Sequence, residues 1–491
     1  MGIALILIYS IFSLFVVFYS IVQLGLVVSY LKNRKKVSEK ISQFAKKPYF
    51  PVVTVQLPVY NEMYVIERLM EAVAQFNYPK DKLEIQVLDD STDQTVQIIA
   101  KKVEELNAEG LDIKHVIRPE RIGFKAGALD YGMQNCKGEF IAIFDADFVP
   151  TPNFLIDTIP YFLDKRIGVV QTRWEHINKE YSLLTRLQAF ALDAHFSVEQ
   201  GGRNFAGHFI NFNGTAGVWR KQAIVEGGGW KADTLTEDLD LSYRAQLKGW
   251  KFIFKEEIGA PAELPAEMNA LKAQQFRWTK GAAECTVKNL RKVVQHKNYS
   301  LWTKINAIFH LMNSFLFIAI FSISFLSFPL FVLKQSHVEF QPFFKLATIS
   351  LFSFAVIGVL YFTSFSKSYS NKGLAFVHFL YYFPLFLSFS LGLSLHNSLA
   401  VLEGYAGKKS PFIRTPKFSL TDKTGNWKGK SYSKIKLNWI TLFEGILAMY
   451  FASGVYLCFE WKDYAMLPLF MMLTIGFGVI SGYSIRHSLQ R

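Results

Sequence analysis

Cysteine is scarce in this chain, which has only three cysteines in 491 residues. Cys136, Cys285 and Cys458 stand far apart and none belongs to a CxxC pair, so neither a disulfide framework nor a zinc site is expected. Gly-rich phosphate loops of P-loop or Rossmann spacing are missing as well. The triplet Gly227-Gly-Gly229 lacks a following Lys-Ser or Lys-Thr and is typical of a turn. The sequence therefore excludes the usual nucleotide-binding loops.

Acidic residues are outnumbered, with 40 Asp and Glu against 54 Lys and Arg, which gives a net charge of +14. Such an excess can serve nucleic acid, anionic lipid or a phosphorylated substrate. Much of it lies in the stretch Leu31 to Lys36 and in residues 404–437, where nine basic residues face one acid, Asp422. We find no nucleic-acid motif. We therefore assign the excess to a membrane face and expect no nucleic-acid partner.

Hydrophobic residues are abundant instead, since 51% of the chain is hydrophobic and 16% aromatic, which is high for a soluble protein. Residues 3–29 form a nearly unbroken apolar run without a small-residue cleavage site, and the basic cluster after Leu31 follows at once. This pattern predicts an uncleaved transmembrane anchor over residues 1–31. By the positive-inside rule the N-terminus lies outside, and residues 32–300 form a cytosolic domain.

Five further apolar stretches are each long enough to span a bilayer of about 30 Å. They cover residues 305–333, 343–366, 373–399, 438–459 and 464–485. Length alone thus predicts six membrane helices. However, the basic residues 404–437 should be cytosolic, so an even number of crossings must separate them from the cytosolic domain. We therefore predict that residues 373–399, interrupted by Pro384, form an interfacial or re-entrant helix, which leaves five crossings.

The predicted organisation is a cytosolic domain between membrane segments. Residues 301–403 hold transmembrane and interfacial helices, residues 404–437 form a basic cytosolic loop, and residues 438–491 form a C-terminal transmembrane hairpin. We expect an integral, multi-pass protein of the cell inner membrane, in contact with membrane lipid.

Within residues 52–300, short apolar runs alternate with helical patterns. Four runs predict buried strands: Val52 to Leu57, Glu84 to Leu88, Ile113 to Ile117 and Phe140 to Phe144. Between them, Glu62 to Phe76 and Thr92 to Ala108 have helical periodicity. This alternation predicts an α/β domain with a mostly parallel sheet and helices on both faces.

Acidic pairs directly follow two of the predicted strands: Asp89-Asp90 follows the second and Asp145-Ala-Asp147 the fourth. Ligands bind at the carboxyl ends of strands in such sheets, so both pairs should project into one crevice. The spacing of Asp145 and Asp147 suits a hard divalent ion that phosphate oxygens also hold, and the expected ligand is a nucleotide diphosphate. Two solvated surface aspartates are the alternative, because such a pair alone is a weak signal.

Seven sequence elements occur in one order along the chain. They are Leu57-Pro-Val-Tyr-Asn-Glu62, Asp89-Asp90, Lys125-Ala-Gly127, Asp145-Ala-Asp147, Phe212-Asn-Gly-Thr215, Thr236-Glu-Asp238 and Gln274 with Arg277-Trp278. In this order the chain resembles, over nearly its whole length, the membrane-embedded family-2 glycosyltransferases of the cellulose synthase, hyaluronan synthase and chitin synthase group. The resemblance implies a cytosolic α/β catalytic domain of the GT-A type, which is Rossmann-like, inserted between α-helical transmembrane segments.

Transferred residue by residue, the resemblance implies a site for a nucleotide-sugar donor. Its donor-binding residues would be Tyr60, Glu62, Asp89, Asp90, Lys125, Asp145 and Arg277. Asp145 and Asp147 would hold Mg²⁺ or Mn²⁺ at the diphosphate, with Asp147 as the more direct ligand. The leaving nucleoside diphosphate gains negative charge, which a divalent ion and a guanidinium stabilise. Arg277 is the candidate for that guanidinium, and Lys125 is a weaker phosphate contact.

The motif Thr236-Glu237-Asp238 is the candidate catalytic element. In the resembling family the attack is a single inverting displacement, so an α-linked nucleotide sugar gives a β-glycosidic bond without a covalent intermediate. We assign removal of the proton from the acceptor hydroxyl to Asp238. A plain helix N-terminus, capped by Thr236 and complemented by the two acids, is the alternative, and both can hold together. Asp240 is expected on the solvent side of that helix and receives no role.

Acceptor binding is assigned to an aromatic residue and its neighbours in the motifs. Trp278 offers an apolar face on which a sugar ring stacks, and Gln-x-x-Arg-Trp spacing is typical of processive polymerases in the resembling family. Core packing is the alternative for an isolated Trp. The resemblance adds Gln274, Phe212, Gly214 and Thr215 as acceptor-binding residues. The Phe212 element departs from the usual Cys-containing form, which weakens its assignment.

Within the basic loop, Phe412-Ile-Arg-Thr-Pro-Lys417 resembles the Phe-x-Val-Thr-x-Lys gating segment of cellulose synthases, with Arg414 in place of valine. Thr415 and Lys417 would then close over the nucleotide diphosphate. The alternative is a basic flank that contacts anionic lipid, which Arg414 favours. Glu444, near the start of a predicted membrane helix, either lines a polysaccharide channel or lies at the interface.

Three functions are compatible with these features. The preferred one is a processive synthase that extends a β-linked polysaccharide, a β-1,4-glucan or mannan, from UDP-glucose or GDP-mannose and passes it through its own helices. The second is a transferase that adds one sugar to a lipid such as ceramide or diacylglycerol. The third is a transporter or receptor with a nucleotide-sensing domain, which needs neither Asp238 nor Arg277. The expected partners are the donor, a glycan or lipid acceptor and an accessory export subunit.

Overall fold

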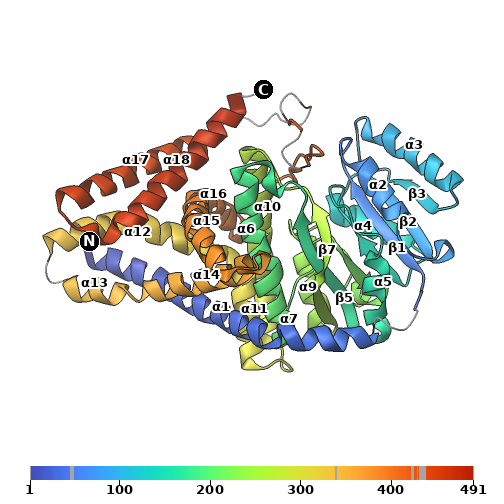
Figure 1. Ribbon diagram of the computed structural model, residues 1–491, viewed down its shortest axis with the longest axis horizontal. Coiled ribbons are helices and arrows are strands. Elements are labelled where there is room, and N and C mark those ends of the chain that lie inside the picture. Colours follow the sequence, from blue (N-terminus) through green and yellow to red (C-terminus); the bar gives the residue numbers. More distant parts are fainter. Residues whose placement is uncertain are drawn as a thin grey trace.

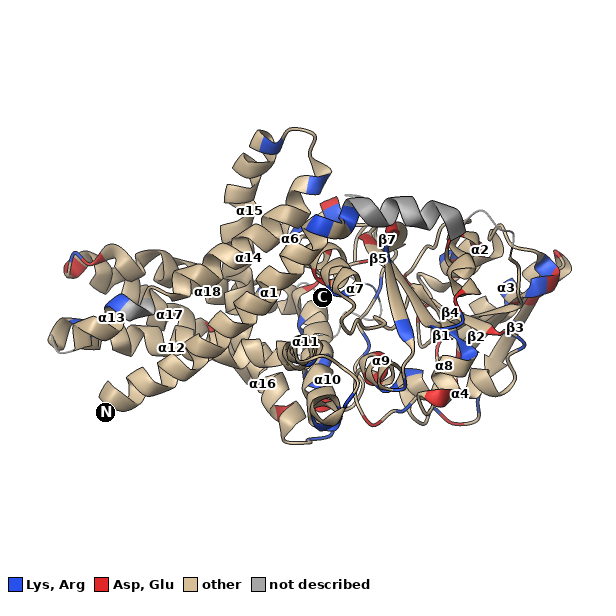
Figure 2. Cartoon of the chain, turned by 90° about the horizontal axis from the view of Figure 1, so that it is seen from below, with Lys and Arg blue, Asp and Glu red and all other residues tan. Residues whose placement is uncertain are grey.

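The computed structural model describes residues 2–44, 49–337, 340–421, 425–427, 430 and 438–489. An α/β domain lies on one side of the molecule and a group of long helices on the other, with the N-terminus among the helices (Figure 1). Figure 2 shows that Lys, Arg, Asp and Glu gather on the α/β domain and near helix ends, whereas the long helices carry few of them. The chain thus separates into a polar part and an apolar part.

One seven-stranded sheet forms the centre of the α/β domain. Its strands are β1 Val53–Val59, β2 Leu83–Asp89, β3 Asp112–Ile117, β4 Phe140–Ile143, β5 Ile167–His176, β6 Gly217–Arg220 and β7 Lys251–Ala262. Their order across the sheet is β3-β2-β1-β4-β6-β5-β7, and β6 runs antiparallel to both of its neighbours while the other pairs are parallel. The four predicted strands and the mostly parallel α/β fold are confirmed.

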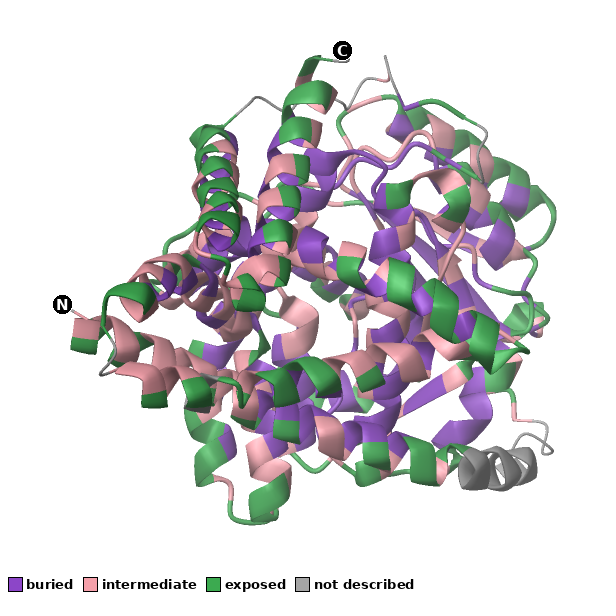
Figure 3. Cartoon of the chain, turned by 60° about the vertical axis from the view of Figure 1, so that its left-hand side comes forward, coloured by how far each residue is buried: buried purple, intermediate pink, exposed green. Residues whose placement is uncertain are grey.

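Successive side chains of a strand point to opposite faces of the sheet, and helices cover both faces. On one face, Val53 and Val55 pack in a core with α2 (Ile66–Ala74) and α3 (Thr95–Ala108). On the other face, Ile141 and Ile143 pack in a second core. Its helices are α4 (Phe124–Gln134), α8 (Lys221–Glu226) and α9 (Glu237–Leu247). Figure 3 shows buried residues along the sheet and exposed ones on the outer sides of the surrounding helices.

Six helical segments are long and apolar enough to cross a membrane, judged by length and composition. They are Gly2–Arg34, Leu301–Ser336, Gln341–Ser368, Lys372–Gly392, Trp439–Glu460 and Tyr464–Leu489. Their helices are α1 (Gly2–Phe44), α11 (Leu301–Leu311), α12 (Phe315–Ser336), α13 (Gln341–Ala347), α14 (Ser350–Phe365), α15 (Lys372–Gly392), α17 (Trp439–Glu460) and α18 (Leu467–Leu489). At most 33% of each apolar window is buried inside the protein, so much apolar surface remains for lipid. The protein is therefore a membrane protein.

The stretch predicted to be one interfacial helix, residues 373–399, forms the two helices α15 and α16 (Ser394–Tyr405). Although α15 is long enough to cross a membrane, its phenylalanines pack against Leu187 and Phe190 of α6 (Leu183–Ala194) and against Leu271 of α10 (Met268–Gln295). Both of these helices belong to the α/β side. In Figure 2, α15 stands across the direction of α14 and α18. The same core also includes Ile480 of α18, itself a membrane-length helix, and the number of crossings stays a prediction.

Candidate active site

A cavity of about 200 Å³ opens at the carboxyl ends of β1, β2 and β4. Most of the predicted site residues line it: Tyr60, Glu62, Asp90, Lys125, Asp145, Asp147, Gly214, Thr236, Glu237, Asp238, Gln274, Arg277, Trp278, Thr415 and Lys417. These residues come from the whole length of the α/β domain and from the loop before α17. The crevice predicted from the ends of the strands is thus where they meet.

The two acids after β4 face cations of the chain itself. The Asp145 backbone N–H donates to Thr215 Oγ1 over 2.9 Å, and its carboxylate accepts from Lys125 Nζ over 2.5 Å. The Asp147 carboxylate accepts from Lys417 Nζ over 2.6 Å. Within the described ranges no group of three or more His, Cys, Asp and Glu is placed to hold a metal. Two carboxylates fit a divalent ion whose other ligands are donor phosphates and water.

Two arginines flank Asp90, which directly follows β2. Arg118 makes a two-pronged ion pair with Asp90, with both N–O distances at 2.6 Å. The Arg121 guanidinium lies 3.4 Å from the centre of the Tyr60 ring and 3.8 Å from Asp90 Oδ2. The sequence reasoning missed both arginines. Their position just after β3, whose carboxyl end meets the same edge of the sheet, could have found them.

Asp89 was assigned to donor binding, and the structure turns it away from the cleft. Its carboxylate lies 2.8 Å from His115 Nε2 and accepts from the Ser91 backbone N–H, also over 2.8 Å. Because adjacent strand residues point to opposite faces, Asp89 and Asp90 cannot both face the nucleotide. Asp89 therefore stabilises the end of β2 through its contacts with His115 and Ser91.

The predicted acceptor element separates into one cleft residue and two buried ones. Phe212 is fully buried against Trp219, and Thr215 is fully buried behind Asp145, so neither lines the cleft as predicted. Gly214 does line it, and its carbonyl accepts from Lys125 Nζ over 2.9 Å. Its φ of +79° favours glycine, and an added Cβ would lie 3.0 Å from Asp238 Oδ2. Glycine here keeps the space beside the candidate base open.

The candidate base lies at the start of α9. Thr236 occupies the N-cap position without a side-chain capping hydrogen bond, so the capping role considered for it is wrong. Its hydroxyl lies 3.4 Å from Cys285 Sγ instead. Burial and the neighbouring Glu237 charge raise the pKa of Asp238 to about 7, against the opposing effect of Lys125. A carboxylate with a pKa near the working pH suits a general base.

On α10, Gln274, Arg277 and Trp278 lie at spacings of three and four residues and therefore share one helix face. Arg277 donates to the Ile413 carbonyl over 2.8 Å and to Thr415 Oγ1 over 2.9 Å. Burial lowers the pKa of Arg277 to about 10, so the guanidinium stays charged at neutral pH. Trp278 is partly buried and lies 6.3 Å, centre to centre, from Trp174, which the sequence reasoning missed. An aromatic wall for a sugar ring is thus present.

The segment Phe412 to Lys417 enters the cleft. Arg414 lies 2.8 Å from Glu62, and the Lys417 ammonium donates to the Glu263 carbonyl over 2.6 Å as well as to Asp147. Both side chains are turned to the protein, which contradicts the lipid-contact alternative for these two residues. Residues 422–424, 428–429 and 431–437 of the predicted basic loop lie outside the described residues.

Two other acids differ from their expected surroundings. Asp240, expected on the solvent side of α9, is fully buried. Glu444 of α17 is fully buried as well, and its carboxylate accepts from Lys272 Nζ of α10 over 2.6 Å. It lies at a contact between helices rather than exposed at the interface. The three cysteines are buried free thiols.

A mostly parallel sheet with acids and an arginine in a cleft at its strand ends, followed by apolar helices, is the architecture expected of a membrane-bound sugar transferase. Residues 51–281 match the model described as glycosyltransferase like family 2. The chain belongs to the family-2 glycosyltransferases and is a hexosyltransferase of the cellulose synthase-like kind.

Curated relatives specify the similarity further. Glucomannan 4-beta-mannosyltransferase 1 of Oryza sativa subsp. japonica is 35% identical over 452 residues, 88% of this chain and 83% of that protein. Glucomannan 4-beta-mannosyltransferase 2 of Arabidopsis thaliana is 36% identical over 450 residues, 88% of this chain and 80% of that protein. The solved mannosyltransferase PcManGT from Pyrobaculum calidifontis, in complex with GDP-Man and Mn²⁺, is 19% identical. It covers 69% of this chain and 97% of its own, with a TM-score of 0.44.

Proposed function

We propose that this protein transfers mannosyl groups from GDP-mannose to a growing β-1,4-linked mannan or glucomannan. Relatives named as glucomannan 4-beta-mannosyltransferases, which match 88% of the chain, support the sugar and the linkage. One observation carries the reaction type. Asp238, Arg277 and the acids Asp145 and Asp147 line the same cleft, so a base, a cation and a metal-binding pair face one space.

In the proposed reaction, Asp238 removes the proton of the acceptor hydroxyl while that oxygen attacks the anomeric carbon of the donor. The new C–O bond forms as the bond to the phosphate oxygen breaks, and its electrons leave with the nucleoside diphosphate. Arg277 and Lys125 stabilise the charge that develops there. Asp145 and Asp147 would hold a Mg²⁺ or Mn²⁺ ion, which would neutralise further charge on the leaving diphosphate. Attack from the side opposite the leaving group turns an α-linked donor into a β-linked product.

Arg121, which lies beside Asp90, supports guanine as the nucleobase of the donor. Arg121 Nε makes no hydrogen bond within the described residues, and the side chain lines the cleft next to the Asp90 carboxylate. Guanine presents N–H donors that suit Asp90 and the adjacent acceptors O6 and N7, which arginine contacts with two hydrogen bonds. Next to its O4 acceptor, uracil has N3–H on one side and C5–H on the other, not a second acceptor. Recognition of GDP over UDP by Arg121 follows from this difference.

Replacing Arg121 by Met should therefore weaken GDP binding about tenfold to a hundredfold, because a two-pronged base contact is lost. UDP affinity should fall only about threefold, since uracil offers Arg121 a single acceptor and one hydrogen bond is lost. Calorimetric titration of both nucleotides measures the ratio, with Glu120→Gln, an exposed neighbour, as the control. Equal losses for GDP and UDP would contradict a guanine contact.

We assign gating to Thr415 and Lys417, because they contact Arg277 and Asp147, the groups that the diphosphate and its ion need. Lys417→Met should raise Mn²⁺ affinity without nucleotide about fivefold, as expected when a competing ion pair worth about 1 kcal/mol is removed. The same substitution should lower turnover, because the loop that closes over the diphosphate loses the Lys417 ammonium. Spin-resonance titration of Mn²⁺ and initial rates measure the two effects. The control is Lys409→Met, an exposed lysine of the same loop, and unchanged Mn²⁺ binding would refute the competition.

Passage of the polymer through the membrane helices belongs to the same proposal, together with the cytosolic position of the α/β domain. The cell inner membrane and an accessory export subunit stay predictions from the sequence, since the similar relatives are plant proteins.

The proposed function is tested on membranes that contain the protein, incubated with Mg²⁺ and radiolabelled GDP-mannose, UDP-glucose, UDP-GlcNAc or UDP-glucuronate in separate reactions. We expect a high-molecular-weight product from GDP-mannose and none from the Asp238→Asn variant. Label confined to a small lipid would instead identify a glycolipid transferase. If no donor gives incorporation that depends on Asp238, the proposed function is wrong.

A further inference from the structure

The two helices that carry the candidate catalytic groups meet behind the cleft. The base Asp238 lies at the start of α9, and Arg277 and Trp278 lie in the first half of α10. The reaction needs the base and the leaving-group cation on opposite sides of one carbon atom. Any shift of α9 along α10 changes that spacing, so the contact between the helices bears on turnover.

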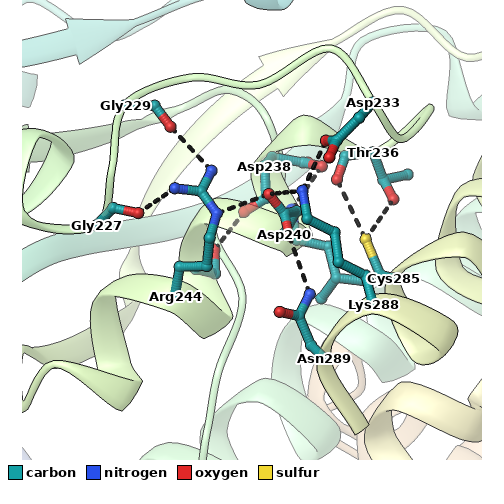
Figure 4. A network of polar contacts seen from close by, with 12 residues as sticks. Gly227, Gly229, Asp233, Thr236, Asp238, Asp240, Arg244, Cys285, Lys288 and Asn289 are labelled. Atoms are coloured by element: carbon teal, nitrogen blue, oxygen red, sulfur yellow. Dashed lines mark hydrogen bonds and ion pairs between the residues drawn. The ribbon is translucent and has the colours of Figure 1, made fainter. Parts of the chain in front are cut away.

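This contact is centred on Asp240, a fully buried acid two residues after Asp238 (Figure 4). Its Oδ1 accepts from Asn289 Nδ2 over 3.0 Å, and its Oδ2 lies 3.0 Å from Lys288 Nζ, both on α10. On α9 itself, Arg244 Nε donates to Oδ2 over 2.7 Å. Both oxygens of one carboxylate are thus used to join α9 and α10.

The same network reaches the loop that leads into the catalytic motif. Arg244 donates to the Gly227 carbonyl and, over 2.8 Å, to the Gly229 carbonyl, while Lys288 lies 2.6 Å from Asp233. Two acids and two bases make the group neutral overall. Residues 227–236 are therefore tied at the back of the cleft to both helices.

Closer to the cleft, the start of α9 and the loop before it lie directly against α10. A Cβ added at Gly281 of α10 would come within 2.6 to 2.8 Å of Thr236 atoms, so the backbone there is already in close contact. The Leu235 backbone N–H donates to Glu284 Oε2 over 2.7 Å. Close packing sets the distance between the helices at this point, and the Asp240 contacts resist sliding and rotation behind it.

Asp238 and Asp240 lie on one helix turn, and their surroundings shift their pKa values in opposite directions. Burial alone would raise the pKa of Asp240, but the Asn289 hydrogen bond and the charges of Arg244 and Lys288 outweigh it and hold the pKa below its usual value. The pKa of Asp238 is raised instead. Asp240 thus stays an anion while Asp238 is able to exchange a proton near neutral pH.

We propose that Asp240 is a positioning residue for sugar transfer, which through Lys288 and Asn289 holds the base Asp238 in register with Arg277. This inference rests on the proposed function. Asp240 does not line the cavity, so it is not itself a catalytic residue. Purely structural stabilisation by a buried ion pair is the competing account, because removing one partner of such a pair destabilises a protein in any case.

The test acts on the α10 side of the contact, where the side chains can change without leaving Asp240 unpaired. Lys288→Met should lower the turnover number about tenfold or more, since small displacements of reacting groups cost large factors in rate. The GDP dissociation constant should change less than about twofold, because the groups assigned to the guanine come from β1, β2 and the segment after β3, and Arg277 keeps its contacts with Ile413 and Thr415. Lys288→Arg keeps the cation and should restore turnover.

The matched control is Arg291→Met, which removes an exposed cation of the same helix that has no ion pair within the described residues. Its turnover should equal that of the unchanged protein. Turnover is expressed per GDP-binding site, counted by calorimetric titration, so that loss of folded protein does not pass for loss of rate. Asn289→Ser, a second and smaller change at the contact, should act in the same direction.

The outcomes separate the accounts. A fall in turnover per site with GDP affinity unchanged, restored by Lys288→Arg, supports positioning. Normal turnover per site in both Lys288→Met and Asn289→Ser overturns the inference, and so does a fall in the number of GDP sites that fully accounts for the lost activity. If the unchanged protein itself transfers sugar from no donor while it binds GDP, the proposed function fails, and the inference fails with it.

Discussion

Replacing Asp238 by Asn should lower the rate of sugar transfer roughly a thousandfold, within the range that a general base contributes. Asparagine fills the same space, so the cleft and the close approach of Gly214 stay as they are. It cannot take the proton of the acceptor hydroxyl. Because Asp238 is not among the residues assigned to the guanine, GDP affinity should change little. Initial rates with labelled donor and calorimetric titration of GDP measure the two quantities.

The pH profile is the control for this assignment. Burial and the Glu237 charge raise the pKa of Asp238 to about 7, so the base is protonated and inactive below that pH and active above it. The kcat/KM of the unchanged protein should therefore rise with pH and level off above about 7, with the rising limb belonging to the Glu237 and Asp238 pair together. The residual activity of Asp238→Asn should lack this limb. Retention of both the limb and a rate within tenfold of the original would show that the base lies elsewhere.

Arg277→Met should lower turnover roughly a hundredfold to a thousandfold, the usual cost of removing a group that stabilises the developing charge. GDP binding should weaken as well, because the diphosphate carries that charge before and after the reaction. Arg277→Lys should recover only part of the loss. A lysine keeps the charge but not the planar fork that reaches the Ile413 carbonyl and Thr415 together.

Separate measurement of kcat and of the GDP dissociation constant distinguishes the two effects of Arg277. The control is Arg166→Met, an arginine of the α/β domain whose side chain is exposed and paired with its near neighbour Asp164. If Arg277→Met and Arg277→Lys both retain nearly full turnover, Arg277 only holds the loop closed and takes no part in leaving-group departure.

Local sequence was sufficient for the position of the site and insufficient for some of its members. Asp90, Asp145 and Asp147 were predicted correctly to face the crevice because they directly follow strands of a parallel sheet. The same prediction for Asp89 was wrong, because a shift of one residue at a strand end changes the face to which a side chain points. Phe212 and Thr215 belong to a motif by sequence, yet they support Gly214 and Asp145 from the core.

Asp240 illustrates what helical periodicity leaves open. A charged residue on a helix is usually solvated, and the sequence of α9 does not reveal that Lys288 and Asn289, about fifty residues later, lie against it. Likewise, the substitution of Arg414 for valine suggested contact with lipid, whereas its partner Glu62 lies more than three hundred residues earlier in the chain. Contacts over such separations depend on how the elements pack.

The sequence by itself determined the alternation of strands and helices, the apolar membrane-length segments, and the order of motifs that identifies the glycosyltransferase family. These properties are local, since they follow from side-chain periodicity and spacing within a few residues. Only the tertiary structure decided that Arg118 and Arg121 flank Asp90, that Lys417 pairs with Asp147, that α15 packs against α6, α10 and α18, and that Asp240 joins α9 to α10. Each of these contacts joins charges or apolar faces far apart in the chain, and because an unpaired buried charge is costly, the partners must meet in the packed structure.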